Sequence, residues 1–317
     1  MHHDARALVD RGGTLIGLVL VAVIFGALIG PQFFAPANLE LIARQTAIVG
    51  MAALGMTMVI VAGGIDLSVG SVIALSTVVI ALLLKGHRGP WAAALGGVAA
   101  SAICGLANGL LITRLRVVPF IVTLGTMLVV RGAAKGLADE RRIEAPATWL
   151  NDLLRSGAHG TTAILPPGIW LVIGLALLVS GVLGYTRFGR RLFAIGSNER
   201  MARLCGVRVE RCKVAVYAAA AAFAGAGGVL QFSKLSVGDP TVAVGLELDV
   251  IAAVIIGGGS LLGGRGTVAG TLVGATIMTL IQIGCSQKGL PNWVQQLVTG
   301  GIIIGAVALD RVRSARS

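Results

Sequence analysis

A short polar segment between two apolar runs holds the residues whose types and spacing are best suited to a functional role. It reads Gly63-Gly64-Ile65-Asp66-Leu67-Ser68-Val69-Gly70-Ser71. A carboxylate such as Asp66 is costly between apolar runs and usually has a function there. Glycines allow the backbone to leave the helical conformation, and inside a membrane irregular backbone is tolerated only against protein or a water-filled cavity. The pattern therefore predicts a wall of a transport path, formed by Gly63, Gly64, Asp66, Ser68, Gly70 and Ser71.

The same segment has a simpler interpretation. It also suits a tight cytoplasmic hairpin between two helices, with Asp66 capping the second helix, because Asp is a favourable N-cap residue. Both interpretations stay open from these residues.

A second Gly-rich segment resembles the first. Residues 254–268 parallel residues 59–72, since each reads as an apolar run, a pair of glycines, small residues and another apolar run. Broken helices in corresponding positions of two halves point to a transport site between them, although Gly-rich segments also serve close helix packing. If the segments are repeats, the same path is lined by Gly257, Gly258, Gly259 and Ser260.

The chain lacks the motifs of an enzyme that would supply its own energy. It has no G-x-x-x-x-G-K-[ST] for nucleotide phosphates and no H-E-x-x-H. Its 4 His and 4 Cys show no metal-binding spacing and no C-x-x-C pair, so neither a metal nor a cofactor is expected. Charges within the apolar runs are too sparse for the relay of ionisable groups that an ion-coupled carrier usually has. Energy for transport would therefore enter from another subunit.

The composition indicates a membrane protein. Apolar residues make up 56% of the chain and charged residues only 13%, with a mean hydropathy of +0.89, whereas soluble domains average about 25% charged residues. The apolar runs have the length that a helix needs to cross a bilayer, and no run shows the alternation of a β-barrel. We expect an all-α polytopic bundle in a single domain, 1–317, with ten spans near 14–30, 45–64, 67–84, 91–113, 117–134, 168–185, 214–232, 246–262, 266–284 and 293–309. The Gly-rich run at 246–262 would also suit a re-entrant segment.

The distribution of basic residues predicts the orientation. The net charge is +12, but the Lys and Arg residues lie in short loops, as the positive-inside rule expects, so nucleic acid is not the expected partner. An inside start places both termini and the densest basic segment, 186–213, in the cytoplasm. A cleavable signal peptide is the alternative for residues 14–30, but the run is long for one, and a proline lies within the A-x-A triplet that follows.

The longest polar loop, 135–167, is expected on the external side. Its residues Trp149, Leu150, Leu153 and Leu154 suggest a short amphipathic helix on the outer surface. This loop would serve either as a docking surface for an external partner or as a solvated connector.

The basic segment 186–213 contains signals for a helix of about two turns. Ser197 and Asn198 are candidate N-caps, and Gly206 is a candidate C-cap. We expect Met201, Leu204 and Cys205 to face one way and Arg200, Arg203 and Arg208 to face others. A basic loop that only sets topology and binds anionic membrane lipid is the alternative.

Four stretches together resemble the membrane-spanning permease subunits of ABC importers for ribose and related monosaccharides, within the branched-chain amino acid and ribose permease superfamily. They are residues 54–76 (LGMTMVIVAGGIDLSVGSVIALS), 119–127 (PFIVTLGTM) with Arg131-Gly132, 188–217 (FGRRLFAIGSNERMARLCGVRVERCKVAVY) and 247–274 (ELDVIAAVIIGGGSLLGGRGTVAGTLVG). The resemblance covers nearly the whole chain.

The resemblance implies a homodimer with the bundle fold of vitamin B12 importers, a pair of cytoplasmic ATPase subunits and a periplasmic or lipoprotein sugar-binding protein. It implies that the short helix expected between Asn198 and Gly206 couples the permease to the ATPase. Met201 stands where the family pattern has its first Ala, and the loop 133–163 lacks the usual Gly-rich run. The coupling residues would be Asn198, Glu199, Arg200, Ala202, Arg203 and Gly206.

The expected function is therefore a non-enzymatic permease for a monosaccharide such as ribose, xylose or galactose, in a bacterial inner membrane. Two alternatives stay open. One is a permease of the same superfamily for branched-chain amino acids or nucleosides. The other is a stand-alone secondary transporter or channel.

Overall fold

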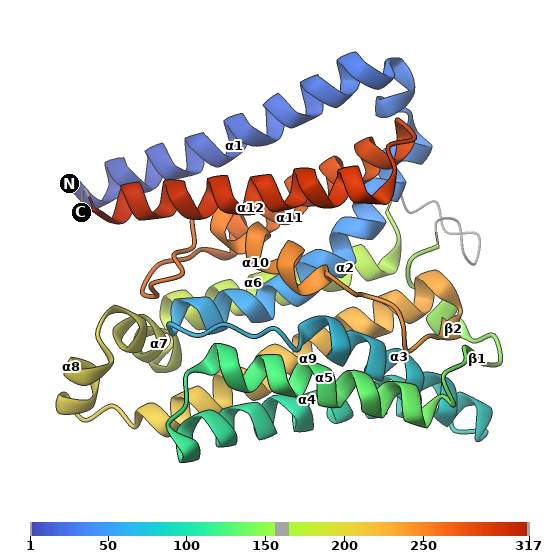
Figure 1. Cartoon of the computed structure of the whole chain (residues 1–317), viewed down its shortest axis with the longest axis horizontal. Coiled ribbons are helices and arrows are strands. Elements are labelled where there is room, and N and C mark those ends of the chain that lie inside the picture. The colour runs from blue at the N-terminus through green and yellow to red at the C-terminus, as the bar shows by residue number, and fades with distance from the viewer. Residues whose placement is uncertain (1, 156–164, 316–317) are drawn as a thin grey trace.

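The computed structural model describes residues 2–155 and 165–315, and within them the chain forms a bundle of helices (Figure 1). The all-α prediction is confirmed. The only sheet in these ranges has two strands, each of two residues. The elements are α1 (His2–Ile29), η1 (Pro31–Phe34), α2 (Pro36–Val61), α3 (Val69–Lys85), α4 (Pro90–Leu115), α5 (Pro119–Leu137), β1 (Ile143–Glu144), η2 (Trp149–Asp152), α6 (Pro167–Tyr185), α7 (Arg187–Ser197), α8 (Glu199–Leu204), α9 (Val209–Leu235), β2 (Val237–Gly238), α10 (Leu246–Ile256), α11 (Val268–Gln287) and α12 (Asn292–Ala315).

Each of the ten apolar runs falls on a helix, but the helices differ in length. In the described ranges six are long and apolar enough to cross a membrane: α2, α4, α5, α6, α9 and α11. Helix α3 and the apolar part of α1 are shorter. Helix α10 has 11 residues, or roughly 16 Å, which is about half the hydrocarbon thickness. The run at 246–262 is therefore divided, and its helix ends at Ile256.

Prolines mark where several of the long helices begin. Pro36, Pro90, Pro119 and Pro167 occupy the first helical positions of α2, α4, α5 and α6. Proline suits that position because its fixed φ is helical. The N–H that proline lacks would also have no hydrogen-bond partner in the first turn of a helix. These residues set the helix boundaries that the apolar runs alone left uncertain.

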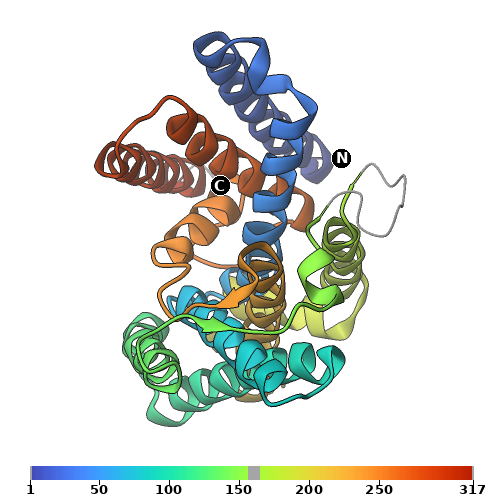
Figure 2. The same cartoon turned by 90° about the vertical axis from the view of Figure 1, so that its right-hand side faces the viewer.

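Helix α2 forms the centre of the bundle. Every residue from Ala47 to Val61 is buried, and the helix packs against α6, α9, α10 and α11. Figure 2 shows α1, α11 and α12 toward one end of α2, and α3, α4 and α5 toward the other. A helix that is apolar all round belongs inside a bundle. The outward faces of α5 and α6 expose residues such as Leu128 and Leu177, as expected for surfaces in contact with lipid.

The outer loop is held against the bundle at two places. Strand β1 pairs antiparallel with β2, so that Ile143 lies opposite Gly238. The helix expected near Trp149 is a single 3₁₀ turn, η2, and Leu150 and Leu154 are buried under it. A short helical turn is therefore present where the sequence suggested one, and its leucines pack beside α9. Residues 156–164 of this loop lie outside the described residues.

Helices α4 and α9 approach more closely than large side chains would allow. A Cβ on Gly109 would lie 2.6 Å from the Val214 Cα, and one on Gly105 would collide with the Tyr217 carbonyl oxygen. Small residues of this kind let helix backbones pack directly against each other in membranes. This pair forms one of the most extensive helix contacts in the bundle.

Substitution of Gly109 by Ala tests that packing. The added methyl group has no room, so we expect Gly109→Ala to lower the free energy of unfolding by about 1–3 kcal/mol. Thermal unfolding of the purified protein in detergent measures the change. Gly181→Ala is the matched control, because Gly181 lies in helix α6 with open space around it and Ala favours a helix. Equal melting temperatures for the two variants would contradict the close contact.

Candidate functional site

The polar segment after α2 begins with a defined helix ending. Gly63 has φ +75°, its N–H donates to the Ile60 carbonyl, and the Gly64 N–H donates to the Val59 carbonyl, both at 2.9 Å. These two bonds form a Schellman motif, in which a glycine takes the left-handed conformation just after the helix. Residues 62–68 then run without helical structure to the start of α3. The predicted break in the helix is therefore confirmed.

Helix α10 ends in the same way. Gly258 has φ +90°, its N–H donates to the Ile255 carbonyl at 2.9 Å, and the Gly259 N–H donates to the Val254 carbonyl at 2.8 Å. The apolar run, the glycines and the two hydrogen bonds match those at the end of α2. The similarity between the two segments thus extends from their sequences to their backbone geometry.

The two Gly-rich connections meet each other and the end of α7. The Gly264 N–H donates to the Val61 carbonyl at 2.9 Å. A Cβ on Gly263 would lie 2.9 Å from the Gly63 Cα, and one on Gly196 would collide with the Val61 carbonyl oxygen. We call this contact of residues 61–64, 196–197 and 263–264 the glycine junction. It places both broken connections beside the end of α7, one residue before Asn198, the N-cap of α8.

Asp66 orders the break after α2 through a local turn. Its Oδ1 accepts hydrogen bonds from the Ser68 N–H at 2.8 Å and the Ser68 hydroxyl at 2.6 Å. The Asn108 amide on α4 donates to the same hydroxyl at 3.0 Å. Ser68 is the N-cap of α3 and makes no side-chain cap bond. Asp66 therefore acts on the loop itself, and neither side chain caps α3 with a hydrogen bond.

Side chains of neighbouring helices form hydrogen bonds with a backbone carbonyl of the same loop. The Ile65 carbonyl accepts hydrogen bonds from the Tyr217 hydroxyl on α9 at 3.3 Å and from the Thr123 hydroxyl on α5 at 3.2 Å. Such satisfaction of irregular backbone by protein groups is what the membrane interior requires.

The other predicted path residues occupy several places around these connections. Gly70 lies against the Ala243 carbonyl and the Glu247 carboxylate, and a Cβ there would collide with both. Gly257 packs on α11 at Gly270, and the Ser260 hydroxyl accepts a hydrogen bond from the Leu262 N–H at 3.3 Å within its own loop.

Four buried side-chain atoms near α3 and α10 have no hydrogen-bond partner in the described part of the chain: Asp66 Oδ2, Ser71 Oγ, Asn108 Oδ1 and Glu247 Oε2.

Helix α8 has the caps that the sequence predicted. The Asn198 side chain accepts from the Met201 N–H at 3.0 Å. At the other end Gly206 has φ +80°, and the Val207 N–H donates to the Ala202 carbonyl at 3.0 Å. The six-residue helix Glu199–Leu204 is therefore stabilised at both ends.

The surface of α8 carries both apolar and charged side chains. Ala202 is buried, whereas Met201 is 53% and Leu204 74% exposed, and Cys205 is exposed. Arg203 donates hydrogen bonds to Glu210 and to Glu199, and these contacts raise the pKa of the Arg203 guanidinium above its usual value. Lys213 forms a further ion pair with Glu199. Exposed apolar side chains within a fixed charge network are typical of a protein-docking surface.

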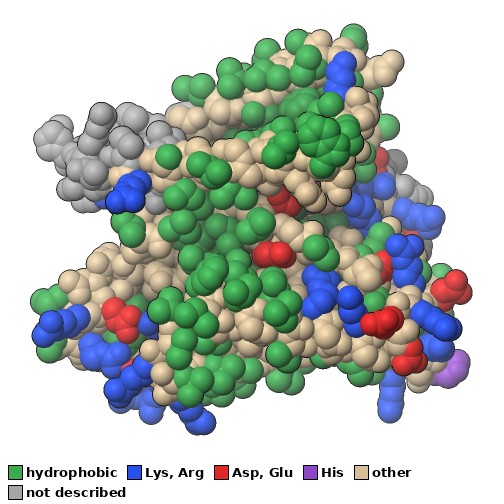
Figure 3. Space-filling model, in the orientation of Figure 1, with side chains coloured by type: hydrophobic (Ala, Val, Ile, Leu, Met, Phe, Trp, Pro, Cys, Tyr) green, Lys and Arg blue, Asp and Glu red, His purple; other side chains and the backbone are tan. Residues whose placement is uncertain are grey.

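Charged side chains gather at two ends of the molecule. Figure 3 shows Lys and Arg near α7 and α8, and a second group of mixed charge near β1 and β2. The middle of this face is largely apolar, with only a few charged side chains. This distribution fits a body that crosses a membrane with its charges in the two aqueous layers.

Comparison with known proteins identifies the family. Residues 38–307 match the family described as the permease component of branched-chain amino acid transport systems. The chain belongs to this permease family.

Curated relatives resemble the permease over nearly its whole length. The ribose import permease protein RbsC of Bacillus subtilis (strain 168) is 38% identical, covering 99% of this chain and 96% of the relative. The L-arabinose ABC transporter permease protein AraH of Azospirillum brasilense is 36% identical, covering 96% and 89%. The fructose import permease protein FrcC of Rhizobium meliloti is 34% identical, covering 94% and 84%. No solved structure matches the permease.

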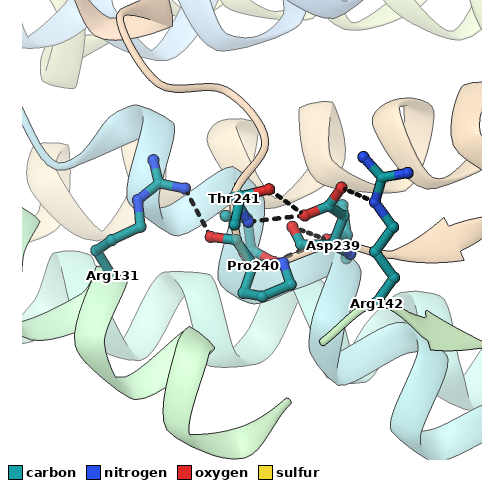
Figure 4. Close-up of polar contacts among 7 residues, drawn as sticks. Arg131, Arg142, Asp239, Pro240 and Thr241 are labelled. Atoms are coloured by element: carbon teal, nitrogen blue, oxygen red, sulfur yellow. Dashed lines mark hydrogen bonds and ion pairs between the residues drawn. The ribbon is translucent and has the colours of Figure 1, made fainter. Parts of the chain in front are cut away.

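A polar network at the opposite end of the permease was missed from the sequence. Asp239 accepts a hydrogen bond from Arg142 Nε at 2.8 Å and bonds from the Thr241 N–H and hydroxyl at 2.8 and 2.6 Å (Figure 4). Arg131 on α5 donates to the carbonyls of Pro240 at 3.0 Å and Val242 at 2.6 Å. The sequence signal was weak, since Asp239-Pro240-Thr241 indicates only a turn.

Electrostatics favour the ionised form of Asp239. Burial alone would raise the pKa of its carboxyl group, but the hydrogen bonds from Thr241 and the Arg142 guanidinium outweigh burial and lower that pKa. The network therefore fixes the connection between β2 and α10, which packs on Gly70 at the start of α3.

Replacement of Asp66 tests its role in the break. Asp66→Leu leaves two buried donors of Ser68, its N–H and its hydroxyl, without their acceptor, at a cost of about 1–3 kcal/mol each, so we expect lower uptake or less assembled permease. Asp66→Asn keeps an acceptor oxygen and should be much closer to the wild type. Solute uptake per amount of membrane-inserted protein measures the effect. Normal uptake and yield for Asp66→Leu would show that Asp66 is replaceable.

Proposed function

We propose that the chain is the permease subunit of an ATP-driven importer and forms the path for a monosaccharide such as ribose, xylose or galactose. The relatives described above are named for ribose, L-arabinose and fructose, and they support a sugar over the branched-chain amino acids of the family description or a nucleoside. The observation that carries the proposal is α8, a doubly capped helix with exposed apolar residues that directly follows the α7 end of the glycine junction.

The proposed path runs along the broken connections. A neutral sugar needs hydrogen bonds that are numerous and weak, and fixed charge would hold it too tightly or exclude it. The buried oxygens of Ser71 and Asn108, which have no hydrogen-bond partner among the described residues, and the glycine backbone of residues 63–70 and 257–260 meet that need. Their exposure to solute would require a second subunit or another conformation, because Asp66, Ser68 and Ser71 are buried in this one.

The proposed topology has ten crossings, with both termini in the cytoplasm of a bacterial cell and the protein in its inner membrane. Helices α3 and α10 would cross together with the extended residues next to them, in a bundle like that of vitamin B12 importers. The basic segment around α7 and α8 would face the cytoplasm, in line with the positive-inside rule.

The proposed partners follow from the two charged ends. Cytoplasmic ATPase subunits would bind α8 through Met201, Leu204 and the Glu199–Arg203 pair. A periplasmic or lipoprotein sugar-binding protein would deliver its ligand to the end that carries β1 and β2. Two copies of the permease would enclose one path.

The natural cysteines allow the orientation to be tested. All four are free; Cys205 is exposed, Cys104 is half-buried, and Cys212 and Cys285 are buried. A membrane-impermeant maleimide should label Cys205 in inside-out vesicles and leave it unmodified in intact spheroplasts, with Cys205→Ser as the control for specificity. Labelling in intact spheroplasts would overturn the proposed topology.

Variants of α8 test the coupling. Arg203→Glu breaks the ion pairs with Glu210 and Glu199, and Gly206→Val strains a residue at φ +80°. We expect the double variant to lower uptake at least tenfold, while the folded permease stays in the membrane and ATP hydrolysis by the partner no longer responds to substrate.

Arg190→Glu, in the same basic segment but on α7, is the matched control and should change uptake much less. Normal uptake by the double variant would exclude α8 as the coupling element. Sugar flux through the purified permease in liposomes without any ATPase would favour the stand-alone transporter.

A further inference from the structure

A groove between α4 and α9 opens toward the surface of the bundle. Its volume is about 440 Å³. Leu106 and Leu110 of α4 form one wall, and Val214, Ala215 and Ala218 of α9 form the other. The two helices pack directly against each other, and α4 runs along the lower edge of the bundle in Figure 1.

The groove follows from how these helices pack. Gly105 and Gly109 bring the α4 backbone onto α9, so the leucines beside them project past the contact. The alanines of α9 are too short to fill the space next to those leucines. Ile103 and Leu115 on α4 are 65% and 61% exposed, so the groove lies within an apolar surface that faces the membrane.

One end of the groove is basic. Arg114 lies in the last turn of α4, and Arg211 in the first turn of α9, and both line the groove. Both side chains are exposed, and neither has an ion pair or hydrogen bond with another described residue. The acidic residue at this end is Glu210, and its carboxylate is already bonded to Arg203.

We infer that this groove binds an anionic phospholipid, with the phosphate between Arg114 and Arg211 and an acyl chain along Leu106, Leu110 and Ala218. Guanidinium groups suit phosphate because their donors match its oxygens in pairs. Basic pockets between membrane helices on the cytoplasmic side bind anionic head groups for this reason.

The chemistry of the walls selects a lipid over other occupants. A soluble phosphate compound would use the two arginines and leave the apolar part of the groove empty. A peptide would need partners for its backbone N–H and C=O groups, and the walls beyond the polar end formed by Thr113, Arg114, Glu210 and Arg211 offer aliphatic side chains only. The bound lipid would lie beside the Arg203–Glu210 pair, and so next to α8.

The test measures lipid retention by the isolated full-length permease and does not depend on transport. The purified, delipidated protein is titrated with phosphatidylglycerol, and bound lipid is counted by native mass spectrometry. We expect Arg114→Gln/Arg211→Gln to reduce retention of the tightest-bound phosphatidylglycerol at least tenfold. Arg187→Gln/Arg190→Gln removes the same amount of charge from α7, outside the groove, and should leave retention unchanged.

A second variant separates the acyl chain from the charge. Ala215→Trp fills the apolar part of the groove and keeps both arginines, and should also reduce retention at least tenfold. Phosphatidylcholine and glycerol phosphate serve as competitors, and neither should displace phosphatidylglycerol at equal concentration. Equal losses in both arginine pairs, unchanged retention in Ala215→Trp, or displacement by glycerol phosphate would each overturn the lipid site.

Discussion

The glycine junction is the contact on which the rest of the structure depends. Three backbone segments from distant parts of the chain touch there, and the Val61 carbonyl accepts a hydrogen bond from Gly264. A side chain on Gly196 or Gly263 would separate them. Because packed interiors shift between discrete arrangements and deform little, movement at α8 would be passed directly to both broken helices.

The membrane explains why these breaks are so fully bonded. Irregular backbone is costly in hydrocarbon unless each N–H and C=O finds a partner. After α2 the Schellman bonds use the first freed groups, Asp66 binds the Ser68 N–H, and the Ile65 carbonyl takes donors from α5 and α9. The loop is thereby joined to α2, α5 and α9, and its shape depends on how these helices are arranged.

Local patterns predicted local structure well, and contacts across the chain poorly. The apolar runs located ten helices, and Asn198 and Gly206 gave both ends of α8, because caps depend on neighbours within a few residues. The Arg142–Asp239 pair joins positions 97 residues apart, and the burial of Leu150 depends on α9, so no local pattern contains them. The glycine junction lies between these cases: each glycine was visible in the sequence, but its backbone partner was not.

The central claim is that α8 and the connection before α11 move as one body through the glycine junction. Spin labels on Cys205 and on Leu262→Cys, with the other cysteines replaced by Ala, report their separation by electron–electron double resonance in the assembled transporter. The account predicts that this separation stays the same on ATP binding, while the distance between Cys205 labels of the two copies changes. A change of several ångströms within one copy would contradict it.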